Sequence, residues 1–370
     1  MLKRLFCQCL CRPEDLKPSH EGLEVVSAFN PGAVRFNGGV VLLVRVAERP
    51  IERRPGYVAS PRYAADGGYL IDWLREDEVI VHDPRAVTLK SSNSIRLTFM
   101  SHFRVLYSGD GRSIDSVGGA FLPEAAEEAF GVEDPRITRL DDTYYFTYVA
   151  VSRHGAATAL ASTRDFRTFQ RHGIIFTCEN KDVLLFPEQI DGQFVAYHRP
   201  NPCYHFGPPE MWIAYSSDLL HWGRHAPLLT GASDWEAGRI GGGIPPFRTP
   251  RGWLEIYHGN AVGTLQDPVG TYVAAAFLTP PDEPDHIIAA TRMPIMAPER
   301  DFETTGFLDD VIFPTGCVQR DDVLQVFYGA ADANTGVVEF SLSELMEQLQ
   351  PLGLQKRAPV QPEVALTLEP

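Results

Sequence analysis

A segment of about 50 residues recurs through most of this chain, and repeats of that length with strand character are typical of β-propeller blades. Each copy contains a proline, a short apolar strand, a polar turn and a second strand that ends near a tyrosine. The four copies that align in this way are residues 133–149, 186–199, 244–259 and 313–329. A fold built from repeated strand pairs is therefore expected.

The turn inside each copy has residues that favour tight hairpins. These turns are Asp141-Asp142, Asp191-Gly192, Arg251-Gly252 and Asp321-Asp322. An earlier segment, residues 32–46, has the same plan with Asn37-Gly38-Gly39 at its turn. Five such units predict an all-β fold, a five-bladed β-propeller, whose blades close around one axis so that the ends of the innermost strands surround a shared pocket.

Two regions depart from the repeat. Residues 50–90 are rich in turn sequences and are predicted to form an insertion between blades, as a lid or an oligomer contact. Residues 341–350 have the pattern of a short helix, followed by a Pro-containing surface extension. We expect one catalytic propeller domain over residues 1–345 and a helix end with its extension over residues 346–370. The insertion and the helix are both candidate contacts of a homo-oligomer.

Acidic side chains outnumber basic ones by 48 to 33, and the formal net charge of −15 repels nucleic acid and anionic membrane surfaces. The chain has no run of about 18 uncharged apolar residues that would cross a bilayer, and its start lacks the apolar run of a signal peptide. We expect a cytoplasmic protein without nucleic-acid or membrane partners. Any anion site must be a local feature.

Three cysteines near the start, Cys7, Cys9 and Cys11, alternate with other residues, which predicts that a strand presents all three on one face. They lack the Cys-X-X-Cys spacing and the nearby histidine that are typical of a metal site. Buried reduced thiols are the simpler interpretation, so no metal is expected. The sequence leaves the role of these three cysteines open.

Asp134 lies in Gly131-Val132-Glu133-Asp134-Pro135-Arg136, directly before a predicted strand, where the proline should hold the preceding residue extended. A carboxylic acid fixed at a strand end in a ring pocket is suited to general acid catalysis. The alternative is a turn aspartate that caps nearby backbone N–H groups. The repeat favours the catalytic interpretation, because it brings such strand ends to one pocket.

The residues that follow the strand-ending tyrosines differ between copies, a variety that structural repeats do not need. Together with two basic residues elsewhere, they predict a cationic cluster that consists of Lys181, His198, Arg199, Arg239 and His258. In an acidic chain such a cluster indicates a phosphate or carboxylate ligand. The structural alternative is that Arg199 and Arg239 form ion pairs between blades and that His258 is a core histidine.

Several motifs, spread from residue 12 to about residue 345, match one enzyme family. They include Phe29-Asn30-Pro31-Gly32-Ala33, Ser101-His102-Phe103-Arg104, Gly131 to Arg136, Leu185-Phe186-Pro187-Glu188, His198-Arg199-Pro200, Tyr257-His258-Gly259 and Tyr328-Gly329-Ala330-Ala331-Asp332. On these motifs the chain resembles glycoside hydrolase family 130, the mannoside phosphorylases. The resemblance implies a five-bladed propeller, in agreement with the repeat count.

The resemblance also implies roles for residues of this chain. Asp134 takes the place of the catalytic acid. The residues that match the phosphate site are Arg199, Arg239, His258 and Tyr272, with Lys181 a weaker match. The residues that match positions holding the mannosyl unit are Arg45, Arg104 and Asp332. Arg239 departs from the family pattern, in which lysine is expected, so the charge is kept while the contact geometry is open.

The implied reaction is a single displacement with inversion, in which phosphate attacks the anomeric carbon of a β-mannoside and the acid protonates the departing oxygen. The product is α-mannose 1-phosphate, and the reaction is reversible. In this family the proton is thought to pass through a mannose hydroxyl. Inorganic phosphate is a co-substrate, and no metal or other cofactor is implied. The linkage, β-1,4 or β-1,2, and the acceptor sugar stay open.

Two other functions suit the same fold. An inverting β-mannosidase has acid and base carboxylates about 6.5–9.5 Å apart, and Asp182, Glu188 or Glu236 would have to supply the base. A water nucleophile gives no reason for the cationic cluster, which favours phosphorolysis. A non-catalytic carbohydrate-binding propeller also suits a pocket lined by aromatic residues, but it leaves Asp134 without a role.

Overall fold

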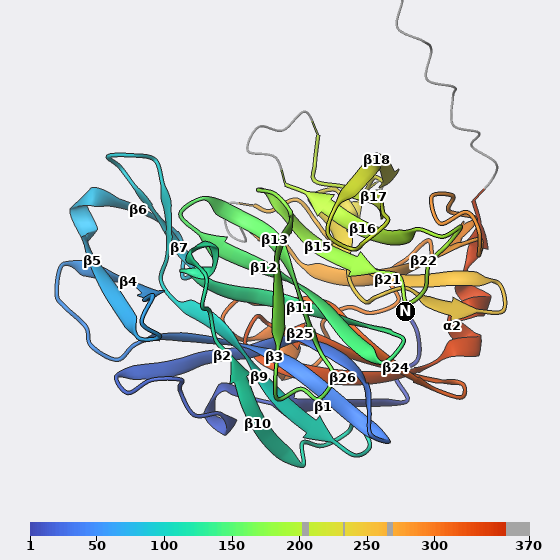
Figure 1. Ribbon diagram of the computed structural model, residues 1–370, viewed down its shortest axis with the longest axis horizontal. Helices are drawn as coiled ribbons and strands as arrows, with labels where there is room; N and C mark the ends of the chain where they lie inside the picture. Colours follow the sequence, from blue (N-terminus) through green and yellow to red (C-terminus); the bar gives the residue numbers. More distant parts are fainter. Residues whose placement is uncertain (202–206, 232–233, 265–268, 353–370) are drawn as a thin grey trace, which may run out of the picture.

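The computed structural model describes residues 1–201, 207–231, 234–264 and 269–352. In these residues β-strands dominate, and the two α-helices, Asp301–Thr304 (α1) and Leu342–Gln348 (α2), are short. The prediction of an all-β chain is confirmed. Figure 1 shows strands through the whole body of the molecule, with helix α2 at its edge.

All five predicted hairpins are present. At two of them, Asn37-Gly38 and Asp191-Gly192, both turn residues have positive φ, as type I′ turns require. The hairpin strands are Leu23–Phe36 (β2) with Gly39–Pro50 (β3), Gly131–Leu140 (β11) with Thr143–Ser152 (β12), Asn180–Leu185 (β15) with Phe194–Pro200 (β16), Phe247–Thr249 (β20) with Gly252–Asn260 (β21), and Ile312–Arg320 (β24) with Val323–Ala330 (β25).

The first two hairpins belong to one eight-stranded sheet of order β14-β13-β12-β11-β9-β3-β2, in which β10 also pairs with β9. The added strands are Met100–Ser108 (β9), Ser116–Phe121 (β10), Gly155–Thr163 (β13) and Gln170–Phe176 (β14). Strands β9 and β11 meet in a single parallel pair, Gly131 with Ser101. This junction is therefore much weaker than the antiparallel pairings on either side of it.

The other hairpins extend into three further sheets, of orders β15-β16-β17-β18, β19-β21-β22-β23-β27 with β20 on β21, and β1-β26-β25-β24. The added strands are Met211–Ser216 (β17), Trp222–Leu229 (β18), Arg239–Gly242 (β19), Tyr272–Thr279 (β22), Ala289–Ala290 (β23), Gln350–Pro351 (β27), Phe6–Cys11 (β1) and Asn334–Ser341 (β26). In the described part of the chain no sheet closes on itself, so the five-bladed ring stays a prediction.

The first strand of the chain, β1, pairs antiparallel with β26, which lies near the end of the described chain. The prediction that the three cysteines share one face is wrong for Cys11. A register shift separates Cys9 from Cys11, so that Cys7 packs against one hydrophobic cluster while Cys11 belongs to another. A β-bulge of this kind interrupts the two-residue alternation of a strand.

Residues between β3 and β9 form two small sheets outside the repeat, as predicted for the insertion. Their strands are Tyr57–Tyr63 (β4) with Tyr69–Arg75 (β5), and Val79–Asp83 (β6), Ala86–Leu89 (β7) and Ile95–Leu97 (β8). The insertion extends to residue 97, beyond the predicted end at residue 90. In Figure 1, β4, β5 and β6 lie at one side of the main body. We call residues 51–98 the insertion arm.

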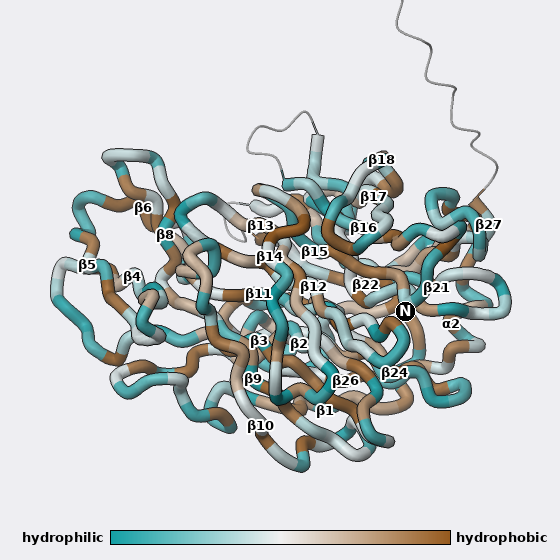
Figure 2. The backbone as a smooth tube through the Cα atoms, viewed as in Figure 1, coloured by the Kyte–Doolittle hydropathy of each residue, from teal (hydrophilic) through white to brown (hydrophobic). Residues whose placement is uncertain are grey.

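Hydrophobic residues, brown in Figure 2, run along the packed strands, whereas many turns are hydrophilic. One core cluster joins the strands of the last two large sheets to helix α2 through residues such as Ile256, Val326 and Leu345, none more than 1% exposed. The hydroxyl of Ser341 caps helix α2 by accepting a hydrogen bond from the Glu344 backbone N–H. The helix is thus confirmed within the predicted segment, while residues 353–370 of the predicted extension lie outside the described residues.

Candidate active site

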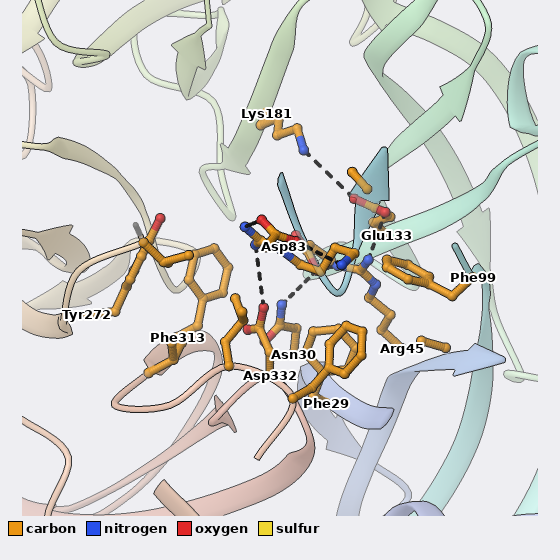
Figure 3. Close-up of a pocket in the computed structure, with 18 of the residues that line it drawn as sticks. Phe29, Asn30, Arg45, Asp83, Phe99, Glu133, Lys181, Tyr272, Phe313 and Asp332 are labelled. Atoms are coloured by element: carbon orange, nitrogen blue, oxygen red, sulfur yellow. Dashed lines mark hydrogen bonds and ion pairs between the residues drawn. The ribbon is translucent and has the colours of Figure 1, made fainter. Parts of the chain in front are cut away.

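One cavity of about 270 Å³ collects most of the residues predicted for the site. Figure 3 shows part of its lining, with Tyr272 and Phe313 on one side of the view and Arg45 and Phe99 on the other. Seven of the ten predicted residues line the cavity: Arg45, Asp134, Lys181, Arg199, Arg239, Tyr272 and Asp332. They come from strands of three of the large sheets and from the turn after β25 in the fourth, so residues far apart in sequence share one wall. The prediction is wrong for His198, which is buried away from the cavity with its Nδ1 2.9 Å from Asn180 Nδ2.

A β-bulge aims Asp134 into this cavity. The register of β11 against β12 shifts between Glu133 and Arg136, and Asp134 has a φ of 53°. Asp and Asn tolerate this left-handed region better than most residues, and a bulge redirects a side chain. The expectation that Pro135 holds Asp134 extended is therefore wrong, because the bulge geometry overrides the usual preference before proline.

The same local structure recurs in two other units. Asn30 has a φ of 47° beside the register shift in β2, and Asp182 has a φ of 54° beside the shift in β15. Both residues line the cavity together with Asp134. Three hairpins thus direct an Asn or Asp side chain into one cavity through the same backbone feature, a positive φ beside a β-bulge.

The carboxylate of Asp134 is 7% exposed and tightly held. Its Oδ1 accepts hydrogen bonds from Asn30 Nδ2 at 2.8 Å and from Arg45 Nη1 at 2.9 Å. Burial alone raises the pKa of Asp134, but Arg45, Arg136, the bond from Asn30 and the charge of Lys181 outweigh it, so the pKa is lowered. In this environment the carboxylate is ionised near neutral pH.

Arg45 is fixed on several sides. Its Nη2 lies 2.7 Å from Glu133 Oε1, while its Nη1 bonds to Asp134. The guanidinium also lies over the rings of Phe29, at 4.6 Å, and Phe99, at 5.6 Å from the centroids. Two charge-assisted bonds and two ring contacts therefore hold one planar donor beside the carboxylate of Asp134.

Asp182 lies at the centre of the cationic cluster. Its Oδ1 accepts a hydrogen bond from Arg136 Nη2 at 3.1 Å, and its Oδ2 lies 2.8 Å from Arg199 Nε. Burial raises the pKa of Asp182, but Arg199, Arg136, His258 and Lys181 outweigh it and lower the pKa well below its usual range. This ion pair of Arg199 lies within one hairpin, β15 with β16, and is therefore not the pair between blades that was the structural alternative; Arg199 also lines the cavity.

His258 does not line the cavity and is fully buried behind its wall. Its Nε2 is 3.6 Å from Asp182 Oδ2, and its ring packs against those of Tyr272 and Phe313, at centroid distances of 5.9 and 4.3 Å. Burial lowers the pKa of His258 to about 3 although Asp182 opposes this, so the imidazole is neutral. A Cβ at Gly241 would lie 2.6 Å from His258 Cε1, which explains why glycine is needed there.

Of three other predicted residues, two line the cavity and one does not. Arg104 does not line the cavity, and its Nη2 donates to the Lys17 carbonyl at 3.4 Å. Lys181 lines it with Nζ 3.8 Å from Glu133 Oε2. Arg239 is an exposed residue at the start of β19 and also lines the cavity.

Four polar lining residues were missed by the sequence analysis: Asn30, Asp83, Arg85 and Glu133. A signal existed for Asn30, because Asn30-Pro31 repeats the pattern of Asp134-Pro135 in an equivalent hairpin. Asp83 and Arg85 lie on the insertion arm, which has no counterpart in the repeat. No pattern in the sequence indicated that the arm reaches the cavity.

Two of the three carboxylates considered as the base of a hydrolase lie away from the cavity. Glu188 is exposed and pairs with Arg248 at 3.1 Å, and Glu236 Oε2 accepts a hydrogen bond from the Tyr257 hydroxyl at 3.1 Å. Asp182 does line the cavity but is held by two arginines. No described carboxylate among the three is thus arranged as a free base.

In residues 1–201, 207–231, 234–264 and 269–352, no group of three or more His, Cys, Asp or Glu side chains is placed to hold a metal ion. No helix there is long and apolar enough to span a membrane.

An all-β chain that gathers a buried aspartate, fixed arginine donors and several cations in one cavity has the construction of a carbohydrate-active enzyme that uses an anion. The family model of glycoside hydrolase family 130, described as beta-1,4-mannooligosaccharide phosphorylase, matches residues 74–351. The chain therefore belongs to glycoside hydrolase family 130.

Relatives of known function support this membership. The chain is 39% identical over 348 residues to the beta-1,2-mannobiose phosphorylase of Listeria innocua, a match that covers 92% of this chain and 96% of that one. It is 34% identical to a 1,2-beta-oligomannan phosphorylase of Thermoanaerobacter over 60% of this chain and 72% of that one. A solved structure of the Listeria innocua beta-1,2-mannobiose phosphorylase with beta-1,2-mannobiose superposes with a TM-score of 0.85, at 38% identity, over 91% of this chain and 96% of that one.

Proposed function

We propose that this chain catalyses the inverting phosphorolysis of β-mannosides to α-mannose 1-phosphate. The observation that carries the proposal is the shared cavity, in which the carboxylate of Asp134 lies with the cations Lys181, Arg199 and Arg239. Cations are what an anionic nucleophile needs, whereas a hydrolase needs a second carboxylate to activate water. The relatives named as mannoside phosphorylases support the same reaction.

In the proposed reaction, a phosphate oxygen forms a bond to the anomeric carbon of the mannosyl unit. The bond from that carbon to the leaving sugar breaks, and its electron pair stays on the leaving oxygen. A proton from Asp134, passed through a mannosyl hydroxyl as the family resemblance implies, ends on that oxygen. One protein carboxylate is sufficient because the phosphate is itself the nucleophile.

Asp134 must be protonated when it donates, although Arg45 and the other cations keep its pKa low. A phosphate dianion near Lys181 and Arg199 opposes their field, which raises the pKa of Asp134. Sugar hydroxyls that engage Arg45 weaken its bond to the carboxylate and act in the same direction. Substrate binding therefore prepares the acid for cleavage, and the ionised carboxylate can accept the proton of the acceptor in the reverse reaction.

The remaining residues are assigned by their position in the cavity. Arg45 and Asp332 are assigned to the mannosyl unit, whereas Arg104 does not line the cavity and is assigned to that unit by the family resemblance alone. Arg199, Arg239, Lys181 and Tyr272 are assigned to phosphate. His258 is a positioning residue, because it is buried and acts through Asp182 and the ring of Tyr272.

Hydrolysis is the weaker candidate. Asp182 is the one considered base that lines the cavity, yet its oxygens are engaged by Arg136 and Arg199, and its pKa is well below its usual range. A base of such low pKa abstracts a proton from water poorly. This environment instead suits a carboxylate that orients arginines around an anion.

The five-bladed propeller is part of the proposal. Dividing the eight-stranded sheet at its single Gly131–Ser101 pair leaves five strand groups, each built on one predicted hairpin. We place them in one catalytic domain over residues 1–345. The pairing of β1 with β26 supports closure, because a first strand that completes the last blade joins the two ends of a ring.

For the substrate we propose a β-1,2-linked manno-oligosaccharide or mannobiose. The Listeria and Thermoanaerobacter relatives, at 39% and 34% identity, carry β-1,2 names. A relative named as a beta-1,4-mannooligosaccharide phosphorylase is 27% identical. The β-1,4 linkage is the alternative, and a comparison of both disaccharides as substrates decides between them.

We further propose that the enzyme needs no metal or organic cofactor, acts in the cytoplasm without nucleic-acid or membrane partners, and forms a homo-oligomer. Full activity after treatment with a chelator would support the first point, and light scattering reports the assembly. A strict requirement for an added metal, or a monomer at all working concentrations, would contradict the respective point.

The reverse reaction tests the proposed function. We expect the protein, given α-mannose 1-phosphate and mannose, to release inorganic phosphate and form a β-mannobiose, because the ionised Asp134 can act as the base. Phosphate release is measured by a colorimetric assay and the linkage of the product by NMR. Absence of phosphate release with every mannosyl acceptor would reject the proposal.

A further inference from the structure

The insertion arm contributes to the cavity although it belongs to no repeat unit. Asp83, Arg85 and Ala86, at the turn between β6 and β7, and Leu97 of β8 all line it. They face the same space as Asp134. The arm is therefore part of the site rather than a distant appendage, and the roles assigned above leave these residues unused.

The turn that carries Arg85 is held in one conformation. Asp83 Oδ1 accepts a hydrogen bond from the Arg85 backbone N–H at 2.7 Å, and Asp83 Oδ2 lies 3.0 Å from Arg85 Nη2. Thr98 donates its hydroxyl to the Pro84 carbonyl at 2.5 Å and its N–H to the Arg85 carbonyl at 3.0 Å. Backbone and side chain of Arg85 are thus both oriented before any ligand arrives.

Arg85 points toward the sugar-binding side of the cavity. Its Nη1 lies 3.8 Å from Asp332 Oδ2, a contact drawn in Figure 3. Asp332 in turn lies within electrostatic reach of Arg45 and Asp134. In a single displacement the nucleophile and the leaving group lie on opposite faces of the anomeric carbon. Arg85 lies on the side of the cavity that holds Asp134 and Asp332, opposite the proposed phosphate, and therefore faces the leaving sugar.

The local charge also argues for a sugar rather than phosphate at Arg85. Two carboxylates, those of Asp83 and Asp332, lie beside this one guanidinium and offset its positive charge, which makes it a weaker partner for a dianion than an unpaired cation. A neutral sugar suits it, because carboxylates accept the protons of hydroxyl groups while the guanidinium donates to their oxygens. Tyr272 is also within reach of Arg85, so contact with phosphate is the alternative that the test must separate.

We propose that Asp83 and Arg85 of the insertion arm bind the acceptor sugar, the unit that leaves in phosphorolysis, and thereby select the acceptor; this rests on the proposed phosphorolysis. The inference gives the arm a function that the repeat does not supply. It also assigns acceptor choice to a segment that can vary without disturbing the hairpins that carry Asp134 and the cations.

The test compares Arg85→Ala and Arg85→Lys with the wild type in the synthetic direction. A lost charge-assisted bond to a sugar oxygen should raise the KM for mannose as acceptor by about tenfold or more in Arg85→Ala. The KM for α-mannose 1-phosphate should change by less than about threefold, and Arg85→Lys should lie between the two enzymes. The matched control is Arg96→Ala, an arginine of β8 on the same arm that does not line the cavity; both constants should stay at the wild-type values.

A binding measurement keeps the test independent of turnover. In an Asp134→Asn background, calorimetry should show that Arg85→Ala weakens binding of β-1,2-mannobiose but not of α-mannose 1-phosphate. Equal loss for both ligands, or a rise confined to the phosphorylated ligand, would overturn the inference. If the wild type fails to use phosphate while Arg85→Ala still weakens only the disaccharide, the proposed function fails and the sugar contact stands.

Discussion

At the residue scale, the proposed acid function depends on how the side chain of Asp134 is held. A left-handed backbone conformation turns its side chain inward, and Asn30 and Arg45 donate to the same carboxylate oxygen. The residue is thus oriented and charged by neighbours from two other strands. The same neighbours lower its pKa, which is why ligand binding has to supply the conditions under which it donates a proton.

Replacing Asp134 by Asn should leave the fold intact and lower kcat by roughly 10²–10⁴-fold, the usual range for loss of general acid catalysis. The amide keeps the shape and still accepts a hydrogen bond from Arg45 or Asn30. Rates are measured by release of α-mannose 1-phosphate. The matched control, Asp142→Asn in the exposed turn of the same hairpin, should keep the wild-type rate. Near-normal activity of Asp134→Asn would reject its role as the acid.

Arg199→Ala should raise the KM for phosphate in cleavage and for α-mannose 1-phosphate in synthesis by tenfold or more, because a charge-assisted contact to the anion is lost. Arg239→Lys should raise these KM values less than Arg199→Ala does, since the lysine charge can still contact one phosphate oxygen. Arg248→Ala, on the surface beside Glu188, is the control. An equal effect of Arg199→Ala on the unphosphorylated acceptor would indicate general damage instead of a phosphate contact.

His258 makes stability depend on pH. Its pKa is about 3 in the folded chain against an ordinary value of 6.5, so the unfolded chain binds the additional proton between these values. The free energy of unfolding should therefore be fully retained above pH 6.5 and fall below it, by about 1.4 kcal/mol per pH unit from this group. Urea unfolding at pH 7, 6 and 5 should show a shallower loss in His258→Gln. Parallel pH dependence in both proteins would contradict the buried neutral imidazole.

At the element scale, the sequence was sufficient to predict the hairpins and the last helix. The five hairpins and helix α2 follow from local turn, strand and capping signals, and these elements are present where expected. The bulges at Asn30, Asp134 and Asp182 were not foreseen, because the extended preference before proline suggested the opposite for Asp134. Backbone register depends on long-range pairing, and the sequence shows only the local preference.

Some residues of the candidate site could likewise be predicted from the sequence, and others could not. Arg199, at a strand end, could be found from the repeat and the resemblance, and Arg45 from the resemblance alone. The burial of His258 and the distance of Arg104 from the cavity depend on packing between sheets, which a single sequence does not show. Asp83 and Arg85 were missed because the insertion arm has no repeated counterpart that would reveal a shared position.

The pairing of the first strand with the last sheet gives a prediction at this scale. Arg4, just before β1, places Nη1 2.7 Å from Glu303 Oε1, and the side chain of Glu303 is 0% exposed. Arg4→Ala leaves that buried carboxylate with Tyr328 and backbone donors, so the free energy of unfolding should fall by about 3 kcal/mol. Urea denaturation measures the change. Arg139→Ala, at an exposed pair with Asp142, should change it by less than about 1 kcal/mol. A similar small effect of Arg4→Ala would show that β1 is not held by this pair.

At the scale of the whole molecule, a chain of formal charge −15 concentrates several cations in one cavity. Two of those cations, Arg199 and Lys181, are paired with the buried carboxylates of Asp182 and Glu133. Removing such charges from water costs free energy even when they are paired, and the proposed phosphate site gives the cations a function beyond stability. The molecule as a whole is therefore organised around one anionic ligand beside one sugar.

The most direct test of this account is the time course of β-1,2-mannobiose cleavage with and without inorganic phosphate. The protein should release α-mannose 1-phosphate together with mannose when phosphate is present, and cleavage should be slower by at least about 100-fold when phosphate is removed, since the nucleophile is then missing. Products are followed by phosphorus and proton NMR, with Asp134→Asn as the inactive reference. Cleavage at the same rate without phosphate, with mannose as the sole product, would contradict the account and identify a hydrolase.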